Sequence, residues 1–133
     1  MRGRIFAAIL GASLLVASRA LAGPTVAEVL QKDLPNAPGM VMTAETVTYA
    51  PGQSSAPHRH GGFLMAYVLK GAIVSQVEGE AEKTFTAGQS WTEAPGAHHL
   101  VCRNPSPTEP AEFLVVFVAA RDAALSTGDA AAH

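Results

Sequence analysis

The chain has 133 residues, of which 48% are hydrophobic, and it carries nine basic and eleven acidic residues. This length suffices for one domain with its own core, and the absence of a basic stripe argues against nucleic acid and anionic membrane as partners. Cys102 is the only cysteine, so an intramolecular disulfide is excluded and the core alone must hold the fold.

The first 22 residues have the pattern of a secretory signal peptide. Arg2 and Arg4 form a basic start, residues 5–16 are an uncharged apolar run, and residues 20–22 (ALA) fit a small-x-small cleavage site. The run is short for a membrane span, although a retained anchor stays open as the alternative. Cleavage removes three of the nine basic residues and leaves a net charge of −5. We therefore expect an exported chain, in a bacterial periplasm or outside the cell.

Residues 23–42 are expected to form an N-terminal arm. Within it, residues 25–34 place Val26, Val29 and Leu30 on one helical face, so a short helix and an extended arm both stay open. Two prolines and a glycine then break the segment.

Short strands follow, separated by turns that contain glycine and proline. We expect them over residues 45–49, 63–71, 72–80, 82–96 (two strands), 98–104 and 112–120. The nearly continuous apolar run at 63–71 indicates a strand buried on both faces. Regularly spaced short strands predict an all-β sandwich or barrel over residues 43–120, with a flexible, small-residue tail at 121–133.

The histidines fall into two groups. His58 and His60 are two residues apart, so in a strand both imidazoles point to one face. His98 and His99 are adjacent, so only one of them can join that face. Neutral imidazole is a common ligand for transition metals, and surface histidines that only form hydrogen bonds are the alternative.

The sequence GQSSAPHRHGGFLMAYVLKG (52–71) resembles the first cupin motif, a glycine, five residues, His-x-His, and then a glutamate followed six residues later by glycine. Gly52, His58, His60 and Gly71 match that spacing.

The sequence GQSWTEAPGAHHLVCRN (88–104) resembles the second cupin motif. Gly88, Gly96 and His99 fit it, whereas Pro95 and Asn104 each lie one place late. The likeness spans residues 43–118 and implies a double-stranded β-helix (jelly-roll) cupin barrel, of the small single-domain exported kind.

The resemblance implies one divalent transition metal (Fe, Mn, Ni, Cu or Zn) on His58, His60 and His99. The motif glutamate falls at Leu64, which cannot bind a metal, so the ligand set departs from the family pattern. Three histidines leave coordination positions open for water or substrate.

Glu93 is the candidate that could compensate for Leu64, because it alternates with Trp91 toward the expected interior. It could be a fourth ligand, orient a histidine or act as a general base; a solvated rim carboxylate is the alternative. His98, Ser75 and Gln76 are further candidates for contacts behind the ligands.

Three functions stay open. The first is a metalloenzyme with dioxygenase- or isomerase-like chemistry on a small molecule. The second is a non-catalytic periplasmic module that binds a small ligand or a metal. The third is a metal-free structural jelly roll. A homodimer that covers sheet edges is also expected.

Overall fold

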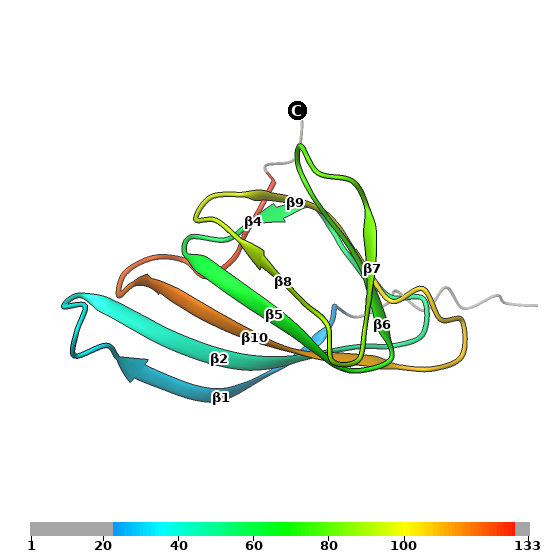
Figure 1. Cartoon of the computed structure of the whole chain (residues 1–133), viewed down its shortest axis with the longest axis horizontal. Helices are drawn as coiled ribbons and strands as arrows, with labels where there is room; N and C mark the ends of the chain where they lie inside the picture. Colours follow the sequence, from blue (N-terminus) through cyan, green and yellow to red (C-terminus); the bar gives the residue numbers. More distant parts are fainter. Residues whose placement is uncertain (1–22, 130–133) are drawn as a thin grey trace, which may run out of the picture.

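The computed structural model describes residues 23–129, and these fold into two antiparallel β-sheets that face each other (Figure 1). This confirms the predicted all-β jelly roll. The predicted signal peptide, residues 1–22, lies outside the described residues. Within residues 23–129 there is no helix with the length and apolar character to cross a membrane.

The two sheets share the strands almost equally. The first sheet has the order β1 (Thr25–Asp33), β2 (Met40–Tyr49), β10 (Ala111–Ala120), β5 (Phe63–Lys70) and β8 (Ser90–Glu93). The second sheet has the order β11 (Thr127–Gly128), β4 (His58–Arg59), β9 (His98–Arg103), β6 (Ala72–Val77) and β7 (Lys83–Thr86), with β3 (Ser54–Ser55) beside β9.

The core lies between the sheets because alternate residues of each strand point inward. On β5 the inward residues Leu64, Ala66 and Val68 are fully buried, and they meet Ile73 from β6 and Phe113 from β10. A tight link between the sheets follows β5 at Gly71, which adopts a φ of 73° that favours glycine.

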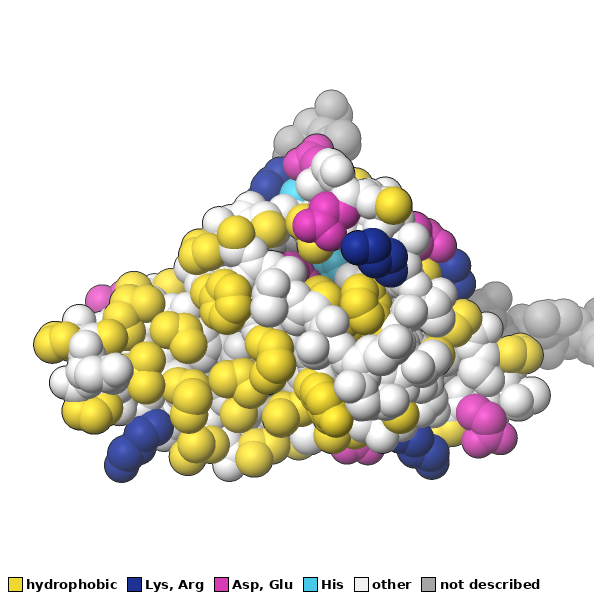
Figure 2. All heavy atoms as spheres, in the orientation of Figure 1, with side chains coloured by type: hydrophobic (Ala, Val, Ile, Leu, Met, Phe, Trp, Pro, Cys, Tyr) yellow, Lys and Arg dark blue, Asp and Glu magenta, His cyan; other side chains and the backbone are white. Residues whose placement is uncertain are grey.

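The prediction that residues 63–71 are buried on both faces is wrong. Phe63, Tyr67 and Leu69 alternate with the core residues and stay 42%, 39% and 44% exposed, because no layer formed by residues 23–129 covers this side of the sheet. Figure 2 shows hydrophobic side chains gathered over β1, β2, β10 and β5. The apolar run therefore encodes one core face and one outer apolar face.

Both ends of the barrel differ from a simple arm and tail. Of the two alternatives for residues 25–34, the extended one is found, since β1 pairs with β2 along its length. The expected flexible tail is wrong for residues 121–129. This segment, called the C-terminal strap below, crosses back over β4 and pairs with it through β11.

Candidate metal centre

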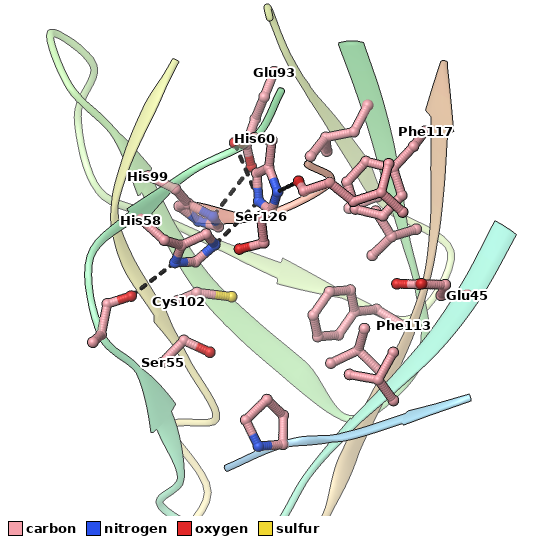
Figure 3. A pocket seen from close by; sticks show the side chains of 18 of the residues that line it. Glu45, Ser55, His58, His60, Glu93, His99, Cys102, Phe113, Phe117 and Ser126 are labelled. Carbon is pink, nitrogen blue, oxygen red and sulfur yellow. Dashed lines mark hydrogen bonds and ion pairs between the residues drawn. The ribbon is translucent and has the colours of Figure 1, made fainter. Parts of the chain in front are cut away.

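The two sequence-predicted histidine groups meet on neighbouring strands. His58 of β4 is the direct cross-strand partner of His99 of β9, so the two side chains share one face. His60 follows two residues after His58 on the same side. One ligand atom from each of the three histidines lies within 4.8 Å of the other two (Figure 3).

Backbone carbonyls fix the tautomers of the two histidines in the first group. His58 Nδ1 lies 2.7 Å from the carbonyl oxygen of Ala56, and His60 Nδ1 lies 2.8 Å from that of Leu125. A carbonyl only accepts hydrogen bonds, so each Nδ1 carries the proton and each neutral ring turns a bare Nε2 lone pair inward.

These two Nε2 atoms face each other at 3.1 Å. Two lone pairs at that distance repel unless a cation or a proton lies between them. Metal–nitrogen bonds of about 2.1 Å place neighbouring ligand atoms about 3 Å apart, which is the separation found here. The donor set therefore fits a divalent transition metal.

The third histidine is held by a side chain and leaves one nitrogen without a partner. His99 Nε2 lies 2.8 Å from the hydroxyl of Ser75, whereas its Nδ1 is buried with no hydrogen bond. Ser75 points inward, as the alternation on β6 predicted, and it orients the ring as outer partners of metal-binding histidines do. A buried nitrogen without a partner is a second observation that fits a metal-binding role for these histidines.

Burial favours the neutral, metal-binding form of His60 and His99. Loss of solvent lowers the pKa of His99 to about 3, with His58 and His60 as further causes. Burial likewise lowers the pKa of His60, and the neighbouring His58 lowers it further. An imidazole that resists protonation loses no affinity for a metal to competing protons.

Glu93 is buried inside the site, 2% exposed, and is not the solvated rim carboxylate of the alternative. Its Oε1 accepts a hydrogen bond from the Trp91 indole at 3.0 Å and lies 3.2 Å from His99 Nδ1. Its Oε2 lies 4.0 Å from His60 Nε2 and has no hydrogen-bond partner. Burial raises the pKa of Glu93, an effect that the Trp91 hydrogen bond reduces. With both histidines neutral, these short distances are not ion pairs.

The register explains how Glu93 relates to the missing motif glutamate. Leu64 on β5 and Glu93 on β8 are direct cross-strand partners, so their side chains leave the sheet side by side. The carboxylate that the motif places on β5 is thus found on the neighbouring strand, β8. A search for the motif along β5 alone finds leucine and misses it.

Gln76 and His98 are not part of the centre. Gln76 points outward and donates a hydrogen bond to the carbonyl of Glu80, because it has the opposite parity to Ser75 on β6. His98 points away from His99, as adjacent residues of a strand must, and lies 2.9 Å from an Asp129 carboxylate oxygen. The expectation that either residue supports a ligand is wrong.

The C-terminal strap completes the centre, and nothing in the sequence signalled this. Leu125 supplies the carbonyl that orients His60, and its side chain packs against the core. The Gly61 amide donates to the Ala124 carbonyl at 3.2 Å, and any side chain at Gly61 would collide with that oxygen. The glycine that follows the His-x-His sequence is therefore required by the strap.

A cavity of about 330 Å³ opens beside the three histidines, a size typical of small-molecule sites. Its wall is mostly apolar and includes Trp91, Phe113 and Phe117. Cys102 also lines it, but burial raises the pKa of this thiol to about 12. The thiol therefore stays protonated, which suits packing rather than metal binding.

Comparison with models of known protein families finds one match. A family model described as a cupin domain (Cupin_2) matches residues 45–117. Among curated proteins, none matches the chain significantly.

Solved structures share the architecture. The protein TT1209 from Thermus thermophilus is 30% identical, with a TM-score of 0.59 over 74% of this chain and 84% of that one. A Klebsiella pneumoniae protein with a double-stranded β-helix domain is 25% identical, with a TM-score of 0.60 over 79% and 84%. DMSP lyase DddQ from Ruegeria pomeroyi is 20% identical, with a TM-score of 0.59 over 65% of this chain, which spans only 42% of the lyase.

Proposed function

The chain belongs to the cupin family, and on that premise we propose that it is a metalloenzyme acting on a small molecule, with one divalent transition metal on His58, His60 and His99. The observation that carries the proposal is the pair of inward Nε2 atoms at 3.1 Å. Neither atom carries a proton, because the Nδ1 of each ring donates its proton to a carbonyl, that of Ala56 or that of Leu125. Such a pair needs a positive occupant.

A bound metal would polarise a substrate oxygen as a Lewis acid or, for iron, manganese, nickel or copper, take part in redox chemistry. The residues of the chain have separate tasks. Glu93, with a raised pKa and a free Oε2, accepts or returns a proton beside the ligands. Trp91 orients this carboxylate through its indole N–H, and the phenylalanines of the wall limit water.

Dioxygenase- or isomerase-like chemistry agrees best with this arrangement, since both need open metal positions and a nearby proton acceptor. The two DMSP lyases among the similar structures are 20% and 17% identical, and at that level the likeness concerns the fold. They do not select the reaction. A binding module without turnover is the competing function, and a substrate panel on the metal-loaded protein separates the two.

Export is part of the proposal. Its support is the basic start, apolar run and ALA sequence of residues 1–22. N-terminal sequencing of the protein recovered from a periplasmic fraction would show a start at Gly23, whereas a start at Met1 in the cytosolic fraction would contradict it.

Elemental analysis of the purified protein tests the centre. We expect about one equivalent of a transition metal in the wild type and none in the His58→Ala/His60→Ala/His99→Ala variant. The metal-loaded wild type should also melt at a higher temperature than the metal-free protein, because an ion that binds only the folded state stabilises it.

His98→Ala is the matched control, because His98 neighbours His99 but faces away from the centre. This variant should keep its full metal content. Equal metal content in the wild type and the triple variant, or none in either after reconstitution, would contradict the proposal.

A further inference from the structure

The cavity carries an acidic group that the proposed metal chemistry does not use. Glu45 of β2 is half-buried and lines the cavity wall, on the side opposite the histidines (Figure 3). In Figure 3 its carboxylate points inward between Phe113 and Phe117. Among residues 23–129, no side chain forms a hydrogen bond or ion pair with it.

The strand register places Glu45 far from the proposed proton acceptor. Glu45 pairs with Val115, Val115 with Ala66, and Ala66 with Trp91, so one row of inward residues runs across the sheet from β2 to β8. Three strand spacings separate the ends of this row, about 14 Å along the sheet. The cavity therefore has Trp91 and Glu93 on one side and Glu45 on the other, and the Phe117 ring lies between them, 5.4 Å from the His60 ring between centroids.

The surroundings of Glu45 suit a cation rather than a hydrogen-bond donor alone. Aromatic rings attract cations over their faces, most strongly where water is excluded. Phe113 and Phe117 lie on either side of the carboxylate (Figure 3), and the aliphatic side chains of Val47 and Val115 also line the cavity. A carboxylate between aromatic rings is a combination that recognises organic cations.

A second carboxylate makes the arrangement costly without such a cation. Glu28 of β1 is the direct cross-strand partner of Glu45, and like charges in that position destabilise a sheet. Burial, and then the charge of Glu28, raise the pKa of Glu45. A positively charged ligand group beside Glu45 would relieve both effects.

We propose that the cavity binds small molecules with an organic cation at one end, held by Glu45 between Phe113 and Phe117, and a metal-binding oxygen at the other. This inference rests on the proposed function, because it assigns the oxygen to the metal on the histidines. It narrows the substrate class to zwitterionic or amino-alcohol-like compounds, and it makes Glu45 the residue that determines specificity.

Matched probes test the cationic end. The metal-loaded protein would be titrated calorimetrically with trimethylammonio carboxylates that have one, three or five methylene groups between nitrogen and carboxylate. Each is compared with its tert-butyl analogue, in which carbon replaces nitrogen, so the positive charge is lost and the carboxylate is kept. We expect the wild type to prefer the cation by about tenfold or more at one of these lengths.

Glu45→Gln should reduce that preference to about one, because it weakens binding of the trimethylammonio compounds and does not weaken binding of the tert-butyl analogues. Its melting temperature should equal or exceed that of the wild type, because the repulsion with Glu28 is removed. Glu109→Gln, an exposed carboxyl outside the cavity lining, is the control and should keep the preference.

Equal affinity for the trimethylammonio compound and its tert-butyl analogue in the wild type, a preference that persists in Glu45→Gln, or no binding of either series would each overturn the inference. Metal content is measured on the same samples, so a failed metal centre is recognised separately. Tetramethylammonium, which has no metal-binding oxygen, should bind metal-free wild type better than metal-free Glu45→Gln. That comparison tests Glu45 even if the metal proposal fails.

Discussion

Glu93 and Leu64, the cross-strand pair on β8 and β5, permit a test by exchange of side chains. Glu93→Leu should lower metal affinity by about 10- to 100-fold, as loss of a carboxylate beside metal-binding histidines commonly does. In the metal-free protein the removal of an oxygen without a partner is offset by the loss of the acceptor for the Trp91 indole N–H, so the free energy of unfolding should change by less than about 1 kcal/mol. Chelator competition and thermal denaturation measure the two effects.

The double variant Glu93→Leu/Leu64→Glu returns a carboxylate to the neighbouring strand and should recover most of the lost affinity. Leu64→Glu alone is the control; it places two carboxylates together in the core and should lower the stability of the metal-free protein. If Glu93→Leu binds metal as tightly as the wild type, Glu93 takes no part in the centre.

At the residue scale, alternation along a strand accounts for what could be predicted. It placed His58 and His60 on one face and Ser75 inward, and it singled out Glu93 through its parity with Trp91. The partnership of Glu93 with Leu64 could not be predicted, because it depends on the register between two strands. Glu45 gave no signal, since a glutamate in an alternating strand is usually solvated.

The C-terminal strap is the element whose removal should matter most. A chain that ends at Arg121 loses the Leu125 carbonyl that orients His60 and the pairing of β11 with β4. We expect about a 10- to 100-fold loss of metal affinity, the range found when the outer partner of a metal-binding histidine is removed. Competition against a chelator of known affinity measures it.

A chain shortened only by its last four residues keeps every one of these contacts and is the matched control. It should bind metal as the full chain does. Unchanged affinity in the chain that ends at Arg121 would show that the tautomer of His60 is held without the strap.

The strap and the outer face of β5 show why some elements escaped prediction. Two of the contacts that hold the strap are made by the backbone carbonyls of Ala124 and Leu125, which no side-chain pattern encodes. The outer apolar face of β5 led to a wrong prediction of burial. Residues 63–71 are apolar on both sides, yet only one side meets the core, because hydrophobicity alone does not say which layer covers a strand.

At the scale of the whole molecule, the outer apolar face predicts self-association. Tyr67 and Phe63 on β5 pair with Leu114 and Val118 on β10, and all four side chains lie on the outer side of the sheet. Exposed apolar patches of this kind commonly mark interfaces. These four side chains carry no charge that would repel a copy of the patch, so a symmetric dimer is the partner we expect.

Light scattering after size exclusion should show a dimer for the wild type and a monomer for Tyr67→Glu/Leu114→Glu, because four carboxylates would face each other across the symmetry axis. Lys83→Glu, on β7 of the other sheet, changes the charge elsewhere and should leave the dimer intact. A wild type that stays monomeric at high concentration would rule out this interface.

The strap also bears on when the metal can enter. Synthesis proceeds toward the C-terminus, so all three histidines exist before the residue that orients His60 has been added. A chain synthesised only as far as His99 thus has the three ligands, but His60 lacks the carbonyl that orients it, so the chain binds an ion less tightly. Tight binding therefore requires a chain that extends beyond Leu125 and has folded as a unit. On the proposed export route, the ions available outside the cytosol, rather than those where the chain is made, decide which metal it acquires.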